Sequence, residues 1–208
     1  MNFDLKYFPR AVEYLGKMPN GLDSYPDAGI KADVHEDLVR EFTKRNQGPG
    51  DGFPKIIDDY MNGRYRGKWL PEVVGNTLVL MMRDACFSSD DAFLDWCCDN
   101  MATLFNKPMY RVMMHVFSTA LVVMGAAKRW SSFHRGSELA VKPMRKSEGR
   151  YETSATLTYP PHLFSGLLAP QLGVTYLAAL KANKAQDPQV IAKEKSETES
   201  IFFVNWLA

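Results

Sequence analysis

The chain has 208 residues, of which 46% are hydrophobic and 24% are charged. These values are those of an ordinary globular protein of about one domain, and they exclude a disordered or fibrous chain. Lysine and arginine number 25 against 24 aspartates and glutamates, so there is no global positive field to attract a phosphate backbone, and we expect no nucleic-acid partner.

The first 52 residues are predicted to form an N-terminal helical elaboration that ends in a linker. Helices are expected over residues 5–18 and 34–46, the second with acidic residues at its start and basic residues in its last turn, where the helix dipole favours them. Residues 22–32 read as a loop. Residues 47–52 (QGPGDG) break the chain, because glycine and proline interrupt regular structure most strongly. We place the domain boundary there.

The start of the chain and its most apolar stretch bear on location. No basic run followed by an apolar segment and a cleavage site is present, so no secretory signal is predicted and the cytoplasm is the expected compartment. The longest apolar stretch, residues 112–127, contains His115 and falls short of the roughly 20 residues that a bilayer crossing needs. We therefore predict no transmembrane segment.

Residues 53–208 are predicted to form one α+β ligand-binding domain, which begins with helical segments. A short helix is expected over residues 54–62 and a longer one over residues 71–85, with Pro71 at its first turn. Ser88 to Asp91 then cap a helix whose apolar residues recur at helical spacing.

The loop between the first two of these helices carries the one basic and aromatic cluster of the sequence. Its members are Arg64, Tyr65, Arg66, Lys68 and Trp69. The cluster could hold an anion, or it could be a solvated loop, and both interpretations stay open.

The rest of the chain repeats an order of one helix followed by two strands. The predicted elements are a helix over residues 108–130, strands over 138–144 and 150–159, a second helix over 161–181, and strands over 189–195 and 200–207. Apolar and polar residues alternate along the strands, which is typical of a sheet with one buried and one solvent-exposed face. The order predicts an α+β fold in which a helical layer packs on a four-stranded antiparallel sheet.

The last strand is apolar on both faces. Phe202, Val204 and Trp206 alternate with Ile201 and Phe203. We expect this strand to be central and covered on both sides, or covered by a second subunit in a homodimer.

A ligand cavity is predicted between the two long apolar helices and the sheet. Methionines are frequent in the helices before residue 130, and their flexible side chains can re-pack around an apolar guest or simply fill gaps in a core. Pro170 is expected to kink the second helix against Gly166, which is either a pocket wall or an ordinary helix break. The predicted pocket residues are Met113, His115, Phe117, Leu121, Phe164 and Leu167.

The remaining histidines and cysteines do not predict catalysis. His115 has no second histidine or cysteine three or four residues away, so a satisfied core histidine is favoured over a metal or haem ligand. His134 is expected to stabilise a helix C-terminus, and His35 to be a surface or capping residue. Cys97 and Cys98 precede Asp99, which does not favour a thiolate. We expect neither an enzyme nor a metal site.

Three segments resemble a known superfamily. They are residues 130–141 (WSSFHRGSELAV), Pro160 at the start of a new helix, and the terminal Phe203-Val204-Asn205-Trp206. Together they resemble the superfamily that groups the four-vinyl-reductase-type small-molecule-binding domains, the transport-particle (TRAPP) subunits and the haem-nitric-oxide-binding domains. Within it the chain looks most like an uncharacterised bacterial paralogous family, over about residues 71–206.

The resemblance implies a cavity between helices and sheet that takes an apolar or aromatic effector, an acyl chain or haem, and it implies pairing as a homodimer. Residues 144–208 lack the clustered cysteines of zinc-binding members. Residues 156–161 read TLTYPP where haem-binding members carry Tyr-x-Ser-x-Arg, so haem is an alternative that the sequence does not favour.

These observations predict a non-enzymatic small-molecule-binding module, sensory or regulatory, in which a guest acts by shifting populations. The alternatives are a structural interaction or dimerisation module with a self-filled core and, less favoured, a haem-based gas sensor.

Overall fold

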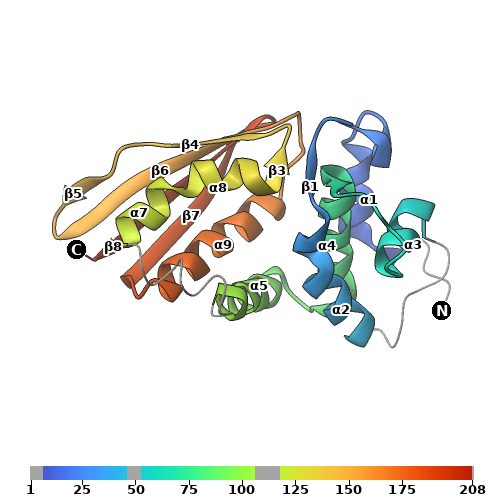
Figure 1. Ribbon diagram of the computed structural model, residues 1–208, viewed down its shortest axis with the longest axis horizontal. Helices are drawn as coiled ribbons and strands as arrows, with labels where there is room; N and C mark the ends of the chain where they lie inside the picture. Colours follow the sequence, from blue (N-terminus) through green and yellow to red (C-terminus); the bar gives the residue numbers. More distant parts are fainter. Residues whose placement is uncertain (1–6, 46–52, 106–117, 208) are drawn as a thin grey trace.

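The computed structural model describes residues 7–45, 53–105 and 118–207, which form an α+β structure with antiparallel sheets (Figure 1). Helices cover one face of a large sheet built from the C-terminal strands. A second group of helices, together with a small three-stranded sheet, lies at the end of this layered part (Figure 1). No helix in the described ranges combines the length and apolar character needed to cross a membrane.

The large sheet has five strands rather than the predicted four. It comprises β4 (Glu138–Val141), β5 (Arg145–Ser147), β6 (Arg150–Thr158), β7 (Gln186–Ser196) and β8 (Glu199–Leu207), in the order β4-β6-β8-β7, with β5 pairing with the other end of β6. The strand predicted over residues 138–144 thus ends at Val141, and β5, which the sequence did not predict, follows on the same side of β6. Pro143 lies between β4 and β5 and has no N–H to donate to the ladder, so pairing is interrupted there.

The hairpin turns are tighter than predicted. Glu148 and Gly149 both have positive φ, of 49° and 77°, as a two-residue turn between antiparallel strands requires. Consequently β5 continues through Ser147, which the sequence placed in the loop. β8 lies between β6 and β7, which confirms that the last strand is central.

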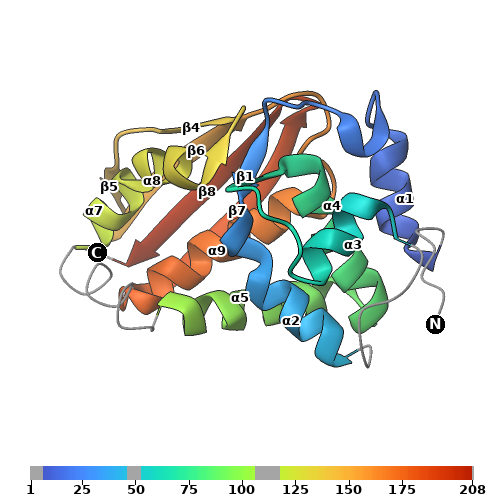
Figure 2. The same cartoon turned by 45° about the vertical axis from the view of Figure 1, so that its right-hand side comes forward.

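Helix α9 (Leu168–Ala182) packs directly on the sheet (Figure 2). A Cβ atom on Gly173 would lie 3.3 Å from the Ala192 side chain, so the absence of a side chain lets the helix approach β7 closely. The Tyr176 and Phe202 rings contact each other at a centroid distance of 5.5 Å. Helix α5 (Asp90–Phe105) lies on the other side of α9, where Lys181 Nζ is 3.9 Å from Cys98 Sγ.

The predicted helix over residues 161–181 begins only at Leu168, so Pro170 does not lie in a helix interior, where the predicted kink against Gly166 would arise. Residues 161–167 are turns, with His162 and Gly166 at φ of 62° and 63°. The first bond of α9 runs from the N–H of Gln171 to the Leu167 carbonyl, so Pro170 lies in the first turn. An amide hydrogen has no partner within the helix at that position, so proline is tolerated there without bending the axis.

The predicted helix over residues 108–130 is not one continuous helix. Its first part lies outside the described residues, and the remainder is α7 (Thr119–Met124) and α8 (Ala126–Phe133), which meet at Gly125. At this break the guanidinium of Arg129 folds back and donates to the Val122 carbonyl. The carbonyls at the end of α7 therefore find a donor without a continuous helix.

The N-terminal half surrounds the buried helix α4 (Glu72–Cys86), whose residues 72–83 are all buried. The other elements of this half are α1 (Pro9–Gly16), the 3-10 turns η2 (Gly21–Asp23) and η3 (Ala32–His35), α2 (Glu36–Arg45) and α3 (Lys55–Met61). Phe8, which directly precedes α1, meets Phe42 of α2 here, with ring centroids 6.4 Å apart. One apolar cluster extends from Phe8 to Trp206, so both halves share a core.

A small antiparallel sheet connects the two halves, in the order β2-β1-β3. Its strands are β1 (Gly29–Lys31), β2 (Trp69–Pro71) and β3 (His134–Arg135). The prediction of a loop over residues 22–32 was therefore wrong for β1, because three residues are too few for a periodic pattern. The predicted division at residue 52 stays a prediction, although β1 pairs with two strands that follow it.

Candidate functional site: a cleft between α2, α3 and the basic loop

A cleft of about 780 Å³ lies between α2, η3, the end of α3 and the loop of residues 63–68, and we call it the α2–α3 cleft. Its charged lining residues are Lys31, Asp33, Glu36, Arg40, Arg66 and Lys68. Its uncharged lining includes Val39, Thr43, Tyr60, Met61 and Tyr65. Three members of the basic and aromatic cluster singled out in the sequence, Tyr65, Arg66 and Lys68, thus lie on one wall of the cleft, whereas Arg64 and Trp69 do not line it.

Helix α2 presents one face to the cleft and the opposite face to the core. Glu36, Val39, Arg40 and Thr43 line the cleft at helical spacing i, i+3, i+4 and i+7. Leu38 and Phe42 are buried on the other side. Helix α2 is therefore packed against the core on its apolar face only, and its other face borders the cleft.

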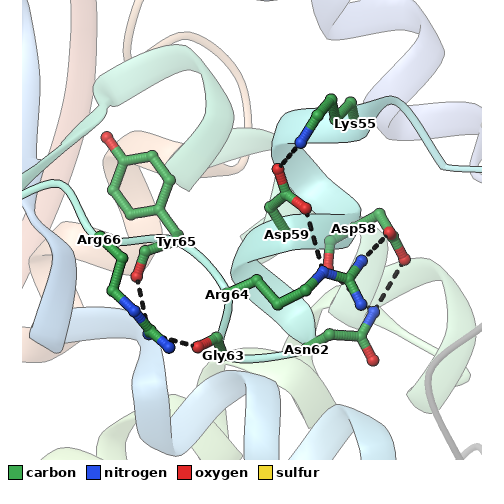
Figure 3. Close-up of polar contacts among 8 residues, drawn as sticks. All are labelled: Lys55, Asp58, Asp59, Asn62, Gly63, Arg64, Tyr65 and Arg66. Atoms are coloured by element: carbon green, nitrogen blue, oxygen red, sulfur yellow. Dashed lines mark hydrogen bonds and ion pairs between the residues drawn. The ribbon is translucent and has the colours of Figure 1, made fainter.

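The basic loop is held in place by the end of α3, and Figure 3 shows these contacts. Gly63 adopts a φ of 64°, which ends the helix, and the amides of Arg64 and Tyr65 both donate to the Asp59 carbonyl, at 2.7 and 2.9 Å. The Arg64 side chain pairs with the carboxylates of Asp58 and Asp59, and Lys55 also pairs with Asp59 (Figure 3). Hydrogen bonds and ion pairs therefore order the loop as a wall of the cleft, although its residues 63, 64 and 66–68 are exposed, so both interpretations of the basic cluster stay open.

Two tyrosines form the aromatic part of this wall. The Tyr65 hydroxyl donates to the Trp69 carbonyl at 2.5 Å, and its ring lies so close to Gly67 that a Cβ there would be 2.4 Å from the hydroxyl oxygen. The Tyr60 ring contacts Tyr65 edge-on at 6.0 Å, and its hydroxyl donates to the Ala32 carbonyl. Burial raises the pKa of Tyr60, so its phenol is a neutral hydrogen-bond donor with a fixed partner.

Behind the cleft wall, η3 carries the buried His35 against Gly75 of α4. A Cβ on Gly75 would lie 2.9 Å from His35 Nε2. Among the residues that the structure describes, this nitrogen has no hydrogen-bond partner. Burial, and secondarily the charge of His134, lowers the pKa of His35 to about 4, so the imidazole is neutral near pH 7. The prediction of a surface or capping role for His35 was wrong.

His134 lies in the same region, where β3 pairs with β1. Its Nδ1 atom is 3.2 Å from both carboxylate oxygens of Glu72, at the start of α4. Its ring stacks on Trp130 with centroids 3.7 Å apart and an interplanar angle of 5°. It contacts Phe164 edge-on at 6.3 Å. His134 therefore joins three segments distant in sequence, a role beyond the helix-terminal one predicted.

The described residues of the predicted helix–sheet pocket do not converge on one open space. Met113, His115 and Phe117 lie outside the described residues. Leu121 is 58% exposed on α7, Phe164 is 1% exposed within the core, and Leu167 is half-buried at the start of α9. Phe164 packs edge-on against Tyr159 and Trp130 at 5.3 and 6.0 Å. The predicted site stays a prediction, as does a haem site that would use His115.

The sequence signal for the α2–α3 cleft was only partial. The basic loop could be recognised from its alternating arginines and tyrosine, but residues of β1, η3 and α2 join it only after folding. In the described part of the chain, no three histidine, cysteine or acidic side chains are grouped so that they could hold a metal ion.

Comparisons with known proteins add no further constraint on this site. The chain matches no protein-family model, no curated protein and no solved structure. Its relation to the superfamily that it resembles in sequence therefore stays a prediction.

Proposed function

We propose that this protein is a non-enzymatic small-molecule-binding module, sensory or regulatory in role, whose ligand occupies the α2–α3 cleft. The observation that carries the proposal is the cleft of about 780 Å³ with an organised wall. Ligand sites are typically concave, with volumes of about 300–1,000 Å³, and combine apolar walls with a few placed polar groups.

The lining suits a ligand with an apolar or aromatic part. Val39, Met61 and the two tyrosine rings supply apolar and aromatic surface. The hydroxyls of Tyr60 and Tyr65 already donate hydrogen bonds to backbone carbonyls. A ligand would therefore contact the rings of these tyrosines. Apolar surface buried against these groups would supply the affinity, at about 25 cal/mol per Å².

Occupancy of the cleft could be read out through β1. Lys31 lines the cleft, and the neighbouring Ile30 pairs with Leu70 of β2 and with His134 of β3. A ligand that binds more tightly to one position of β1 would therefore favour one position of β3, the strand that pairs with β1 and directly follows α8. Such a bias requires only a differential affinity for two arrangements.

Filling the cleft tests the proposal. Thr43→Trp places a large side chain in the cleft, whereas Lys44→Trp adds the same side chain at a position whose lysine is 77% exposed. We expect native mass spectrometry and thermal-shift measurements with a panel of aromatic and apolar molecules to identify a ligand of the wild type. That ligand should still bind Lys44→Trp and fail to bind Thr43→Trp. Equal binding to both variants, or no ligand at all, would contradict the proposal.

The predicted cavity between the helical layer and the sheet remains a second possible location for the ligand. Tyr176 carries a buried hydroxyl there with no partner among the described residues, and a guest could supply one. A ligand whose binding survives Thr43→Trp and is lost in Tyr176→Phe would favour that location.

A dimerisation module is the alternative function, favoured by the outer face of β8. Ile191 and Phe203 are paired neighbours on that face and are 53% and 41% exposed, and Leu207 is also exposed. A second copy packed on this face would cover the apolar strand on both sides. Light scattering should then show a dimer for the wild type and a monomer for Phe203→Lys. A monomeric wild type at all concentrations would rule out this alternative.

A further inference from the structure

The two arginines of the basic loop are in opposite electrostatic situations. Arg64 is occupied by the carboxylates of Asp58 and Asp59, on the side of the loop that faces α3. Arg66 instead donates to two backbone carbonyls, of Gly63 at 2.5 Å and of Tyr65 at 3.5 Å (Figure 3). Within the described ranges it forms no ion pair. A guanidinium has five N–H donors, so these two contacts leave most of its capacity unused.

Two lysines on the same cleft also lack a carboxylate partner. The amide of Ala32 donates to the Lys68 carbonyl at 3.1 Å, and Lys31 is opposite Trp69 in the β1–β2 ladder. These contacts bring residues 31 and 68 to the same end of the small sheet. The ammonium of Lys31 lies 5.1 Å from the centre of the Phe133 ring, and neither lysine is ion-paired with another described residue.

The acidic side chains of the cleft lie at helix starts, where they have a stabilising role of their own. Asp33 lies in the first turn of η3 and Glu36 in the first turn of α2, where a negative charge stabilises a helix start. Arg40, the fourth basic lining residue, pairs with Asp37. What remains is a group of three cations that line one cleft, each without a carboxylate partner among the described residues.

We propose that the ligand of the α2–α3 cleft is an organic anion, whose carboxylate, phosphate or sulfonate group is bound by Arg66, Lys68 and Lys31. The inference rests on the proposed function, because it assigns a chemical class to the ligand of that same site. The planar fork of Arg66 suits two oxygens of one anionic group, and the lysines add point charges. The apolar or aromatic part of the molecule lies against Tyr65, Val39 and Met61.

A pair of fluorescent probes of nearly equal shape tests the charge requirement. One is 8-anilinonaphthalene-1-sulfonate, an aromatic anion, and the other is N-phenyl-1-naphthylamine, which has no charge. Both are titrated into the full chain at low and high salt, with Thr43→Trp as the variant that reports whether binding is in the cleft. Aromatic carboxylate and phosphate monoester competitors then show which anionic group is preferred.

Charge-removing variants identify the groups that hold the anion. We expect the double variant Arg66→Gln/Lys68→Gln to bind the anionic probe about tenfold more weakly. Each exposed charge is expected to change the dissociation constant about threefold, and the two effects multiply. Lys44→Gln, at an exposed position of α2 that does not line the cleft, is the matched control and should change the dissociation constant by less than about twofold. Lys68→Gln alone keeps the test valid if loss of the Arg66 contacts disorders the loop, which limited proteolysis would detect.

The outcomes separate the two proposals. Salt-sensitive binding of the anionic probe, lost in Thr43→Trp and weakened in the Arg66 and Lys68 variants, supports the organic-anion assignment. Equal, salt-insensitive binding of both probes that Thr43→Trp abolishes would overturn that assignment and leave the cleft as a ligand site. Probe binding indifferent to Thr43→Trp, or no binding, would overturn the proposed function itself.

Discussion

The Nδ1 atom of His134 lies 3.2 Å from each carboxylate oxygen of Glu72, and both side chains are almost completely buried. Glu72 begins α4, whereas His134 follows α8, so the contact joins the two halves of the molecule. The same histidine pairs through its backbone with Ile30 and stacks on Trp130. One buried polar contact thus lies where the small sheet meets α4 and α8.

Removal of this contact should destabilise the protein strongly. His134→Ala leaves the carboxylate of Glu72 buried without a partner, which costs about 3–5 kcal/mol in comparable buried pairs. Urea unfolding measures the change in the free energy of unfolding. Glu13→Gln, which removes an exposed pair with Lys17, is the control and should cost less than about 1 kcal/mol. A similar cost for both variants would show that the buried contact has no special role.

Acid should destabilise the protein through His35. Its pKa is about 4 in the folded state against 6.5 as the ordinary value, so the unfolded chain binds the proton more tightly. The stabilisation is therefore fully present above about pH 6.5 and is lost as the pH falls towards 4, up to about 3 kcal/mol. His35→Leu should reduce the pH dependence of the unfolding free energy in this window. His162→Gln, at a partly exposed histidine, should not. Parallel curves for the wild type and His35→Leu would contradict this assignment.

Two buried tyrosines should respond oppositely to loss of the hydroxyl. Tyr14 donates to the Leu163 carbonyl at 3.1 Å and accepts from Asn76 at 3.2 Å, so Tyr14→Phe should destabilise by about 1–2 kcal/mol. The Tyr176 hydroxyl has no partner among the described residues, so Tyr176→Phe should be neutral or stabilising. Thermal unfolding of the two variants measures the contrast. A clear loss of stability in Tyr176→Phe would reveal a partner for its hydroxyl.

Close packing around His35 should make Gly75 intolerant of a side chain. A Cβ there would lie 2.9 Å from His35 Nε2 and 3.0 Å from Ile30, so Gly75→Ala should destabilise by about 1–3 kcal/mol. Gly16→Ala is the control, because nothing lies within 4 Å of a Cβ at that helical position. Alanine in a helix is favoured over glycine by up to about 1 kcal/mol. If Gly75→Ala were as stable as Gly16→Ala, the wall behind the cleft would be looser than these distances indicate.

Elements with a long periodic pattern were predictable from the sequence. The alternation of Tyr151, Thr153, Ala155 and Leu157 predicts β6, and β8 was recognised as central because both of its faces are apolar. Such patterns depend on neighbours within one strand or helix. The α+β class with antiparallel strands follows from their order along the chain.

The basic loop could be recognised in the sequence as a motif, but its position on the wall of the α2–α3 cleft could not. The sequence by itself determined the hairpin pairs β4–β6 and β7–β8, several of the helices and the cluster around Arg66, since each reflects residues close together in the chain. Only the tertiary structure decided that His35 is buried, that Glu72 meets His134, and that α2 faces the loop across a cleft. The physical reason is that burial, charge pairing and enclosed space depend on contacts between distant segments, which no local period encodes.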